Sequence, residues 1–438
     1  MNTEDKNIKY IKIRKAILLK KSTVLSFLSL FIYKIVLDFS YYFIIHPIWN
    51  YMGFVLNINI LKIVESYMML FIVFILIPKS YNKISNIAIW LLLLMSYVPM
   101  LSLFGMANEP RLYMYSVTLF WILIFLFYRT IFKISLRSIK KAQSIIILWA
   151  IFIIFIIIDF VLIYRYLGFS LHFNLKQVYN IRAKYVSKNI SFSDYLFNWS
   201  AYIVDPVFFA IFWIKRKWIF VTLIVVLQLL LFSGTGMKSY LFAIPFVLLL
   251  MWVVKCKYPF SLVSISFAGG VIFGMFSYLL INDRWITSLF TRRTLFVPAE
   301  LSFYYYDFFS KHGFLFLSSQ RIFREFFKYP YKLSPPHLIA AVYFNNPLMS
   351  ANNGIISDAY MNFGFVGLVL WAVIVVIILK LIDNFSSGKS SIITIAAVAM
   401  PVMFLSNSTL STSLLTHGLF ISLILLYLLP RGIENKYG

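Results

Sequence analysis

The sequence predicts an all-α polytopic membrane protein with about twelve transmembrane helices and two enlarged loops on the outer side that contain short amphipathic helices. Three observations carry this prediction: 61% of the 438 residues are hydrophobic, 13% are charged, and the apolar residues gather in long stretches. A soluble domain has roughly 25% charged residues. The composition therefore excludes water-soluble enzymes, disordered tails and disulfide scaffolds, because the chain must use lipid as most of its solvent.

Twelve stretches are apolar enough to cross a bilayer. A span needs about 20 mostly apolar residues, because the hydrocarbon core is roughly 30 Å thick and a helix rises about 1.5 Å per residue. The predicted spans are 24–45, 58–77, 84–106, 113–132, 144–164, 198–214, 218–233, 239–254, 261–281, 360–382, 391–407 and 412–429. The whole chain, 1–438, reads as one integral membrane domain.

The basic residues orient these spans. Residues 1–23 form a basic arm with Lys/Arg between Lys6 and Lys21, and no small-residue cleavage site follows the first span, so we expect a signal anchor. Short loops on that side stay basic, whereas 46–57 has no Lys or Arg. The positive-inside rule then places both termini in the cytoplasm. This bias also accounts for the net charge of +25 without nucleic acid.

Two longer segments, 165–197 and 282–359, fall on the outer side and are still basic. Long loops escape the positive-inside rule, so their charge is free for another role. We interpret them as sites for an anionic ligand; ordinary solvated loop charge is the alternative. In the first loop, a short helix over 175–186 would place Tyr179 and Arg182 on one face. Arginine offers a planar fork of donors to phosphate, and tyrosine stacks on sugar rings.

The larger segment carries several polar groups. Arg292 and Arg293 precede Glu300, and an aromatic run that includes Tyr305 and Tyr306 leads to Asp307. Residues 317–329 predict a basic amphipathic helix that lies flat on the outer leaflet. Its basic side would hold Arg321, Arg324 and Lys328, and its apolar side Phe323, Phe326 and Phe327. Its charges would then contact either a ligand or lipid headgroups.

Two glycine-containing turns complete the outer side. Residues 233–239 place free backbone amides and Lys238 where an anion could bind, although the P-loop spacing is absent. Residues 352–364, with Asn353 and Asp358, lead into the tenth span. The alternative for this second turn is a plain helix entry with small residues for packing.

Charged residues within spans are costly and are usually paired. Lys34 with Asp38, and Lys62 with Glu65, have the spacing of self-neutralising pairs on a helix. Asp159 and Asp205 lie in or at the ends of spans, where they could face a polar cavity. No closely spaced histidines occur and Cys256 is the single cysteine, so we expect no disulfide, no metal held by the protein and no cofactor.

The layout resembles the Wzy-type polymerases of bacterial surface polysaccharides, O-antigen or capsule. The matching pieces cover about residues 175–370: the 178–182 stretch followed by 198–199, the 233–239 turn, 292–307, and the 353–367 entry. Their order and placement carry the resemblance. One departure is Lys238, where an arginine would be expected after the glycine-rich turn.

The resemblance implies a membrane glycosyltransferase on the outer (periplasmic) face of the bacterial inner membrane. It would move the growing glycan from undecaprenyl pyrophosphate to the non-reducing end of an incoming lipid-linked repeat unit. The lipid bilayer and these lipid-linked oligosaccharides would be its partners, together with a chain-length regulator protein. Neither a nucleotide-sugar fold nor a DxD-type metal site is visible in the sequence. This is consistent with a lipid-linked donor and no metal.

This reaction assigns expected roles to the outer residues. A positively charged set would hold the pyrophosphate as the glycosidic bond breaks: Arg182, Arg292, Arg293 and Lys238. The candidates for the base that takes the acceptor proton are Asp358, Asp307 and Glu300, with His312 or His337 as a pH-sensitive option. The expected sugar contacts are Tyr179, Tyr305, Tyr306 and Asn353.

Two rival functions fit parts of the same pattern. An O-antigen ligase-type enzyme would use the same donor and differ in its acceptor. A flippase for lipid-linked repeat units belongs to another class and would need two similar halves with short loops. No internal repeat is evident, and one outer segment is long. The sequence therefore favours the polymerase.

The predicted topology is testable at Cys256, between the eighth and ninth spans, which we expect on the cytoplasmic side. A membrane-impermeant thiol reagent should not label it in intact cells and should label it after the membrane is permeabilised. Labelling from outside in intact cells would overturn the topology from the eighth span onward.

Overall fold

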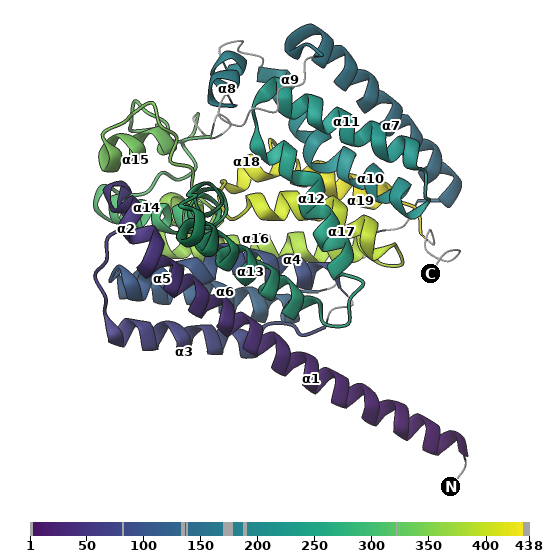
Figure 1. The fold of residues 1–438 in the computed structure, drawn as a ribbon, viewed down its shortest axis with the longest axis horizontal. Helices are drawn as coiled ribbons and strands as arrows, with labels where there is room; N and C mark the ends of the chain where they lie inside the picture. Colours follow the sequence, from purple (N-terminus) through teal and green to yellow (C-terminus); the bar gives the residue numbers. More distant parts are fainter. Residues whose placement is uncertain are drawn as a thin grey trace. The chain divides into compact units, whose positions relative to one another are not determined.

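A computed structural model describes residues 3–80, 83–132, 136, 139–169, 178–186, 191–320, 323 and 325–431, and the side chains of residues 3–20, 179, 180, 186, 191 and 192 lie outside this description. Within the described residues the regular secondary structure is helical and no strand occurs (Figure 1). The expectation of an all-α protein is therefore confirmed for this part of the chain.

Nine helices in the described part of the chain are long and apolar enough to cross a membrane. They are Lys21–Met52, Ile84–Met106, Arg111–Thr130, Lys141–Leu167, Ser193–Ile214, Trp218–Thr235, Pro259–Ile281, Ile355–Ser386 and Leu410–Leu428. Each overlaps one predicted span. The other three predicted spans fall on shorter helices of 17, 16 and 14 residues: α3 (Ile60–Leu76), α12 (Lys238–Val253) and α17 (Ser391–Phe404). A helical polytopic membrane protein is thus confirmed, and a count of twelve spans stays a prediction.

The chain divides into two compact units. Unit 1 comprises Met1–Tyr81, Ile89–Leu126 and Cys256–Ala372, and unit 2 comprises Asn82–Ala88, Phe127–Lys255 and Val373–Gly438. Besides α3, the elements that lie mainly in unit 1 are α1 (Thr3–Ser40), η1 (Tyr41–Ile45), α2 (His46–Trp49), η2 (Asn50–Met52), η3 (Leu93–Tyr97), α5 (Val98–Met106), α6 (Arg111–Thr130), α13 (Pro259–Ile281), η6 (Thr287–Phe296), α14 (Val297–His312) and α15 (Pro335–Phe344). The helix α4 (Ile84–Leu92) is divided between the two units. Besides α12 and α17, those of unit 2 are α7 (Lys141–Leu162), η4 (Ile163–Leu167), α8 (Val178–Val186), α9 (Ser191–Trp199), η5 (Ser200–Val204), α10 (Asp205–Ile214), α11 (Trp218–Thr235), α18 (Leu410–Leu414) and α19 (Leu419–Leu428). The helix α16 (Ile355–Ser386) contributes to both units.

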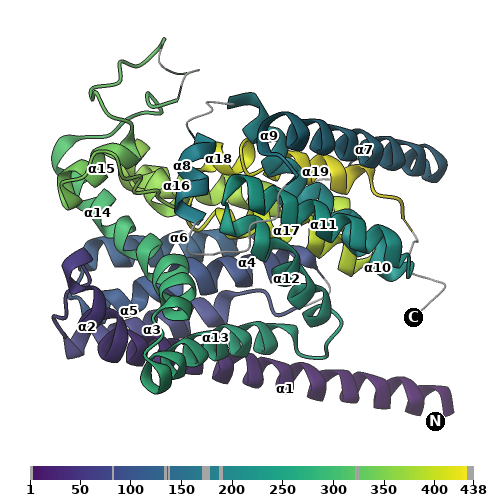
Figure 2. The same ribbon diagram turned by 45° about the horizontal axis from the view of Figure 1, so that its top comes forward.

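In unit 1, α1 packs along α13 through small residues (Figure 2). Ser26 Oγ lies 3.4 Å from Ser261 Oγ across this interface. One turn beyond Ser261, Ser264 Oγ accepts a 3.0 Å hydrogen bond from Trp90 Nε1. Lipid tails are as apolar as leucine, so helices in a bilayer associate through close packing and polar contacts rather than through the hydrophobic effect. Buried serines at this interface supply both.

The predicted pair Lys34–Asp38 is confirmed, whereas the predicted pair Lys62–Glu65 is wrong. Lys34 is 1% exposed, and its Nζ lies 2.7 Å from Asp38 Oδ2. Glu65 instead forms a salt bridge with Arg111 at 2.9 Å. The Lys62 ammonium donates to the backbone oxygens of Asn108 (2.9 Å) and Glu109 (2.6 Å). Lys62 is buried beside these carbonyls, which explains why it does not turn outward to Glu65.

Several helices leave apolar side chains uncovered along one face. On α3 these include Leu61, Val64 and Met68, and on α13 they include Phe273 and Leu280. Exposed apolar stripes of this kind are rare on soluble monomers and are expected where helices face lipid. They support association with a bilayer.

The helix α16 breaks near its start at Phe363 and Gly364. Gly364 has φ 59° and ψ −139°, a conformation that is open essentially only to glycine, and an added Cβ would lie 2.5 Å from the Phe314 ring. At this break, the backbone N–H groups of Leu315 and Phe316 donate to the oxygens of Met361 (2.9 Å) and Asn362 (3.0 Å). The break therefore anchors the chain that leaves α14.

This anchoring corrects the amphipathic helix predicted over 317–329. The described residues of that stretch form turns and bends rather than an α-helix, and Arg321 and Arg324 lie outside the described residues. Leu317 has φ 63°, and its N–H donates to Asn362 Oδ1 at 2.9 Å. A left-handed residue held by α16 prevents the helix from starting there. The spacing of charges and phenylalanines was helical, but these contacts outweigh it.

Unit 2 is built around α10, α11, α12 and α17, which pack against one another. Phenylalanines from three elements fill the contact beside them, with Phe152 and Phe208 ring centroids 4.6 Å apart and Phe212 and Phe220 4.7 Å apart. The short helix predicted over 175–186 is confirmed as α8 from Val178 onward; residues 175–177 lie outside the described part.

Candidate functional site

Three carboxyl groups of unit 1 interact where α14 meets the connection between α5 and α6. We call Glu109, Glu300 and Asp307 the carboxyl cluster. Glu109 acts electrostatically on Glu300, and Asp307 acts on Glu109. Such a group of acids can exchange protons with a bound substrate, because neighbouring carboxyls shift one another's pKa values.

Glu300 sits in the first turn of α14, just after Pro298 starts the helix. It is 4% exposed, and its Oε2 atom has no hydrogen-bond partner among the described residues. One turn further on, Tyr304 hydrogen-bonds to its carboxyl group. Gly53, with φ 103°, presses against both groups: a Cβ there would lie 2.0 Å from Tyr304 Oη and 3.5 Å from Glu300 Oε1. Only glycine fits at this approach.

The environment raises the pKa values of two members of the cluster. Burial raises the pKa of Glu300 well above its ordinary value, and the negative charge of Glu109 raises it further, against the hydrogen bond from Tyr304. Burial likewise raises the pKa of Glu109 to about 7, with Lys62 lowering it and Asp307 raising it. These surroundings therefore favour the protonated form of Glu300, and the pKa of Glu109 lies near neutral pH.

Asp307 differs from both, although it lies on the same helix as Glu300. Its carboxylate contacts Lys311 Nζ at 2.7 Å and accepts a 2.6 Å hydrogen bond from Tyr343 Oη. Partial burial pushes its pKa upward, but the hydrogen bonds from Lys311 and Tyr343 outweigh this, so the pKa lies below its ordinary value. The Tyr343 ring stacks on the Tyr304 ring with centroids 4.5 Å apart. This contact links the tyrosine bound to Asp307 with the tyrosine bound to Glu300. The surroundings thus favour the protonated form of Glu300 and the ionised form of Asp307.

Of the two arginines on η6, one is buried and one is exposed. Arg292, 6% exposed, donates to Ser288 Oγ at 2.8 Å, and its guanidinium lies 5.0 Å from the Trp49 ring. It also contacts Met52 Sδ at 3.2 Å, which ties η6 to the segment just before Gly53. Arg293 is exposed. Arg292 therefore packs within unit 1, and the side chain of Arg293 reaches the surface.

Three predicted site residues are buried in the packing of unit 1. Asp358, at the start of α16, accepts 3.1 Å hydrogen bonds from Asn362 Nδ2 and Trp371 Nε1. Tyr305 is fully buried and donates to Ala351 O at 3.0 Å, which leaves no ring face for a sugar. Asn353 is also buried. These residues fix the entry of α16.

The remaining predicted residues of unit 1 are partly exposed. Tyr306 stacks on Tyr113, with ring centroids 4.4 Å apart. His312 contacts Phe308 O through Nδ1 at 2.9 Å, and His337 contacts Pro347 O in the same way at 2.9 Å. Both histidines keep Nε2 for another contact.

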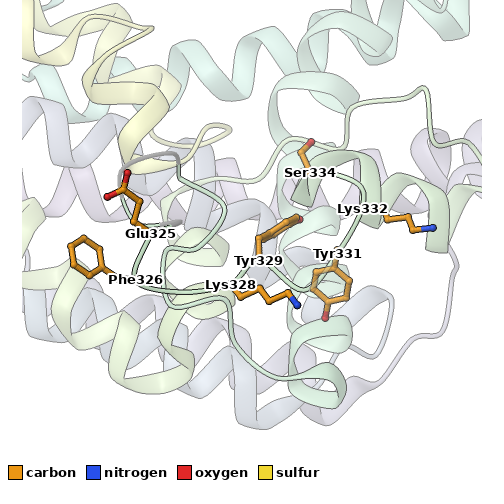
Figure 3. A pocket seen from close by; sticks show the side chains of 7 residues that line it. All are labelled: Glu325, Phe326, Lys328, Tyr329, Tyr331, Lys332 and Ser334. Atoms are coloured by element: carbon orange, nitrogen blue, oxygen red, sulfur yellow. The ribbon is translucent and has the colours of Figure 1, made fainter.

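A surface hollow of about 610 Å³ lies in the segment that follows α14. Figure 3 shows Tyr329 and Tyr331 between Lys328 and Lys332, with Glu325 at the far end. Phe326 and Ser334 complete its lining. The Tyr331 ring lies 5.7 Å from Phe308 on α14, so the hollow adjoins the helix that carries the cluster. Aromatic rings and ammonium groups together suit a charged sugar.

In unit 2 the structure brings together two residues that the sequence placed in separate motifs. Gly236, with φ 67°, ends α11 and packs on α8: a Cβ there would lie 3.1 Å from Arg182 N. Lys238 begins α12 two residues later, so both basic residues belong to one local region; Arg182 is exposed. The side chain of Tyr179 lies outside the described residues.

Comparisons with protein-family models, curated proteins and solved structures find no match to this chain. Among the described residues, no group of three or more His, Cys, Asp or Glu side chains is placed to hold a metal ion.

Sequence reasoning missed Glu109 and Tyr304. Glu109 is a single acid in a short connection, and no local spacing marks it. The one available signal was an acid in a short outer loop that otherwise holds only Arg111. Its role emerges only when Lys62 and α14 are placed beside it in space.

Glu109 gives a prediction for the pH dependence of stability. Its pKa of about 7 in the fold exceeds the ordinary value of 4.5, so the folded protein binds more protons than the unfolded chain between these values. This group's contribution is fully present below about pH 4.5 and is lost as the pH rises through 7. The unfolding temperature of the purified parent should fall as the pH rises from about 4.5 through 7, and this fall should be smaller for Glu109→Gln.

Glu65→Gln is the matched control, because this acid is paired with Arg111 in a salt bridge rather than buried without a partner. It should keep the parent's slope between pH 4.5 and about 8. Equal slopes for the parent and Glu109→Gln would contradict the raised pKa.

Proposed function

We propose that this protein polymerises lipid-linked oligosaccharide repeat units by glycosyl transfer on the outer face of the bacterial inner membrane. The observation that carries the proposal is the pair Glu300 and Glu109: a buried carboxyl with an unpartnered oxygen, and a neighbouring carboxyl whose pKa burial raises to about 7. The pair lies in segments whose charge pattern predicts an outer location. It adds to the resemblance a physical means of moving the acceptor proton.

The reaction needs one proton acceptor and one anion site. The anomeric carbon of the growing glycan loses its bond to pyrophosphate, which leaves with the bonding electrons, and forms a bond to the acceptor hydroxyl. Ionised Glu109 takes the hydroxyl proton, because a base with a pKa near the working pH is most effective. Glu300, still protonated, donates a hydrogen bond to a substrate oxygen. Asp307 remains ionised and fixes Tyr343.

The charged leaving group calls for cations that are open to solvent. In unit 1 the exposed Arg293 is a candidate for this role, and Arg292 on the same element is buried. In unit 2 the exposed Arg182 is a separate candidate, close to the partly exposed Lys238. The hollow lined by Lys328, Tyr329, Tyr331 and Lys332 would hold sugar rings of the substrate. No step of this reaction uses a metal or cofactor.

The first test is a gel ladder of surface polysaccharide from a strain that lacks the chain, complemented with the parent or with variants. Loss of the chain should leave core plus one repeat. Glu109→Gln should lower polymerisation by roughly 10²–10⁴-fold, because a general base is removed. A strain complemented with Glu300→Gln should make shorter glycan chains than one complemented with the parent. Glu65→Gln should restore the full ladder at equal protein level.

Other outcomes of this experiment point to the rival functions. Long chains that stay on the lipid carrier would indicate a ligase. Loss of every repeat at the surface, with units trapped on the cytoplasmic face, would indicate a flippase. A full ladder from both Glu109→Gln and Glu300→Gln would remove the carboxyl pair from the mechanism.

The arginines give a second prediction. Arg293→Ala should shift the ladder to single repeats, because one donor to the developing pyrophosphate charge typically contributes about 10²–10³-fold. Arg182→Lys should also lose activity, since lysine lacks the bidentate fork. The control is Arg284→Ala, another exposed arginine of the same segment as Arg293, which should keep long chains. Long chains from the Arg293 and Arg182 variants would leave these residues with a general charge role only.

A further inference from the structure

Unit 2 contains two buried acids that the proposed reaction does not use. Asp159 lies near the end of α7, and Asp205 is the first residue of α10; they are 0% and 4% exposed. The hydroxyl of Ser200, the first residue of η5, donates to Asp159 Oδ2 and lies 3.4 Å from Asp205 Oδ1. One hydroxyl proton therefore serves two carboxyl groups inside predicted spans.

The second oxygens of these carboxyl groups have no hydrogen-bond donor. Asp159 Oδ1 and Asp205 Oδ2 are both buried without a partner among the described residues. The same holds for Gln228 Oε1, whose side chain is 3% exposed. All three atoms are acceptors. Leaving a buried acceptor unsatisfied destabilises the fold, and more so for a charged group, so these atoms call for a positive or donating species.

Gln228 is held against the same π-helical segment as Ser200. Its Nε2 donates to Ala201 O at 3.0 Å and to Tyr240 O at 2.8 Å. In a π-helix each carbonyl accepts from the N–H five residues later, which for Ala201 would be that of residue 206. Residue 206 is a proline and has no N–H, so the Ala201 carbonyl lacks its helical donor. Gln228 supplies the missing donor, and this places its free oxygen beside η5. It is a neutral ligand atom that is independent of the two acids.

No basic side chain of the described residues forms a salt bridge with either acid: the four salt bridges there involve Asp38, Asp383, Glu65 and Asp307. Charged side chains within spans are expensive unless they are paired or line an ion path. A shared proton would link the two carboxyl groups but would leave Gln228 Oε1 unsatisfied. A metal cation accepts several oxygen ligands and could satisfy acceptors of this kind.

We propose that Asp159, Asp205, Ser200 and Gln228 form a binding site for an alkali cation, with sodium as the best fit. Carboxylate, hydroxyl and amide oxygens are hard ligands that suit such ions. A monovalent ion is favoured because the cost of dehydrating an ion within a span grows with the square of its charge. π-Helical turns inside α-helices often mark functional sites, and η5 is such a turn within the continuous helix Ser193–Ile214.

This site differs from the metal centres that the sequence argues against. That argument concerned histidine and cysteine ligands, whereas these four side chains offer only oxygen. The proposal does not depend on glycosyl transfer, so it stands or falls apart from the proposed function.

Thermal unfolding of the full-length protein in neutral-lipid nanodiscs tests the site. The unfolding temperature should rise by several degrees as NaCl replaces choline chloride at constant ionic strength, because an ion that binds only the folded state stabilises it. Asp159→Asn and Asp205→Asn should lose this sodium-dependent shift. In choline chloride both variants should be at least as stable as the parent, since each removes one buried charge without changing the shape of the side chain.

The matched control is Asp383→Asn, which alters a unit 2 acid that contacts Lys83 and Tyr128 instead. It should keep the sodium-dependent shift even if its overall stability changes. Gln228→Met, which preserves length but removes the amide oxygen, should weaken the shift without abolishing it.

A direct measurement guards against indirect effects on stability. The purified parent should retain radioactive sodium that excess NaCl displaces and choline chloride does not, and Asp205→Asn should retain at least tenfold less. A parent that retains no sodium and unfolds at the same temperature in both salts would overturn the proposal. Equal retention by the parent and both aspartate variants would overturn it as well.

Discussion

Inside the hydrocarbon core a polar atom has no water to bind, so its partner must come from the protein. This constraint governs the structure. Lys34 and Asp38 neutralise each other, and Tyr67 donates a 2.8 Å hydrogen bond to the same carboxylate. Asp358 takes donors from Asn362 and Trp371. Wherever a buried group in this chain lacks such a partner, a ligand or a proton becomes the most direct explanation.

The carboxyl cluster shows how one helix can hold acids of opposite character. Glu300 faces inward against Gly53 and Tyr304, and burial keeps it protonated. Two turns later, Asp307 meets Lys311 and Tyr343 and stays ionised. Different protonation states at neighbouring sites are what acid and base chemistry requires. The distinction arises from the surroundings of each side chain, since the two acids share a helix.

Hydropathy alone predicted the helices well, because the bilayer imposes both their length and their composition. The i, i+4 spacing also identified Lys34–Asp38, since both partners lie on one helix. Contacts between distant segments were beyond such rules. The Lys62 ammonium donates to the backbone oxygens of Asn108 and Glu109, which lie 46 and 47 residues further along the chain.

The candidate site shows the same limit. Glu300, Asp307 and Arg293 were predicted from residue type and position in the outer segment; the structure places the two acids on α14 within the carboxyl cluster and leaves Arg293 exposed. No local sequence pattern marks Glu109. Arg292 has the expected charge, but its guanidinium contacts Ser288 and the Trp49 ring within the protein. Charge patterns can locate a site, but only packing decides which of its groups face a ligand.

Leu315 and Phe316 are hydrogen-bonded to the break in α16, so the chain between them and Met361 forms one long excursion whose two ends are held together. The entropy cost of closing a loop grows only with the logarithm of its length. The hollow at 325–334 lies within this excursion, away from the buried residues that fix the entry of α16. Once the ends are fixed, its exposed residues can be exchanged with little effect on folding. Evolution can therefore remodel this surface while the apolar helices and the carboxyl cluster keep their places.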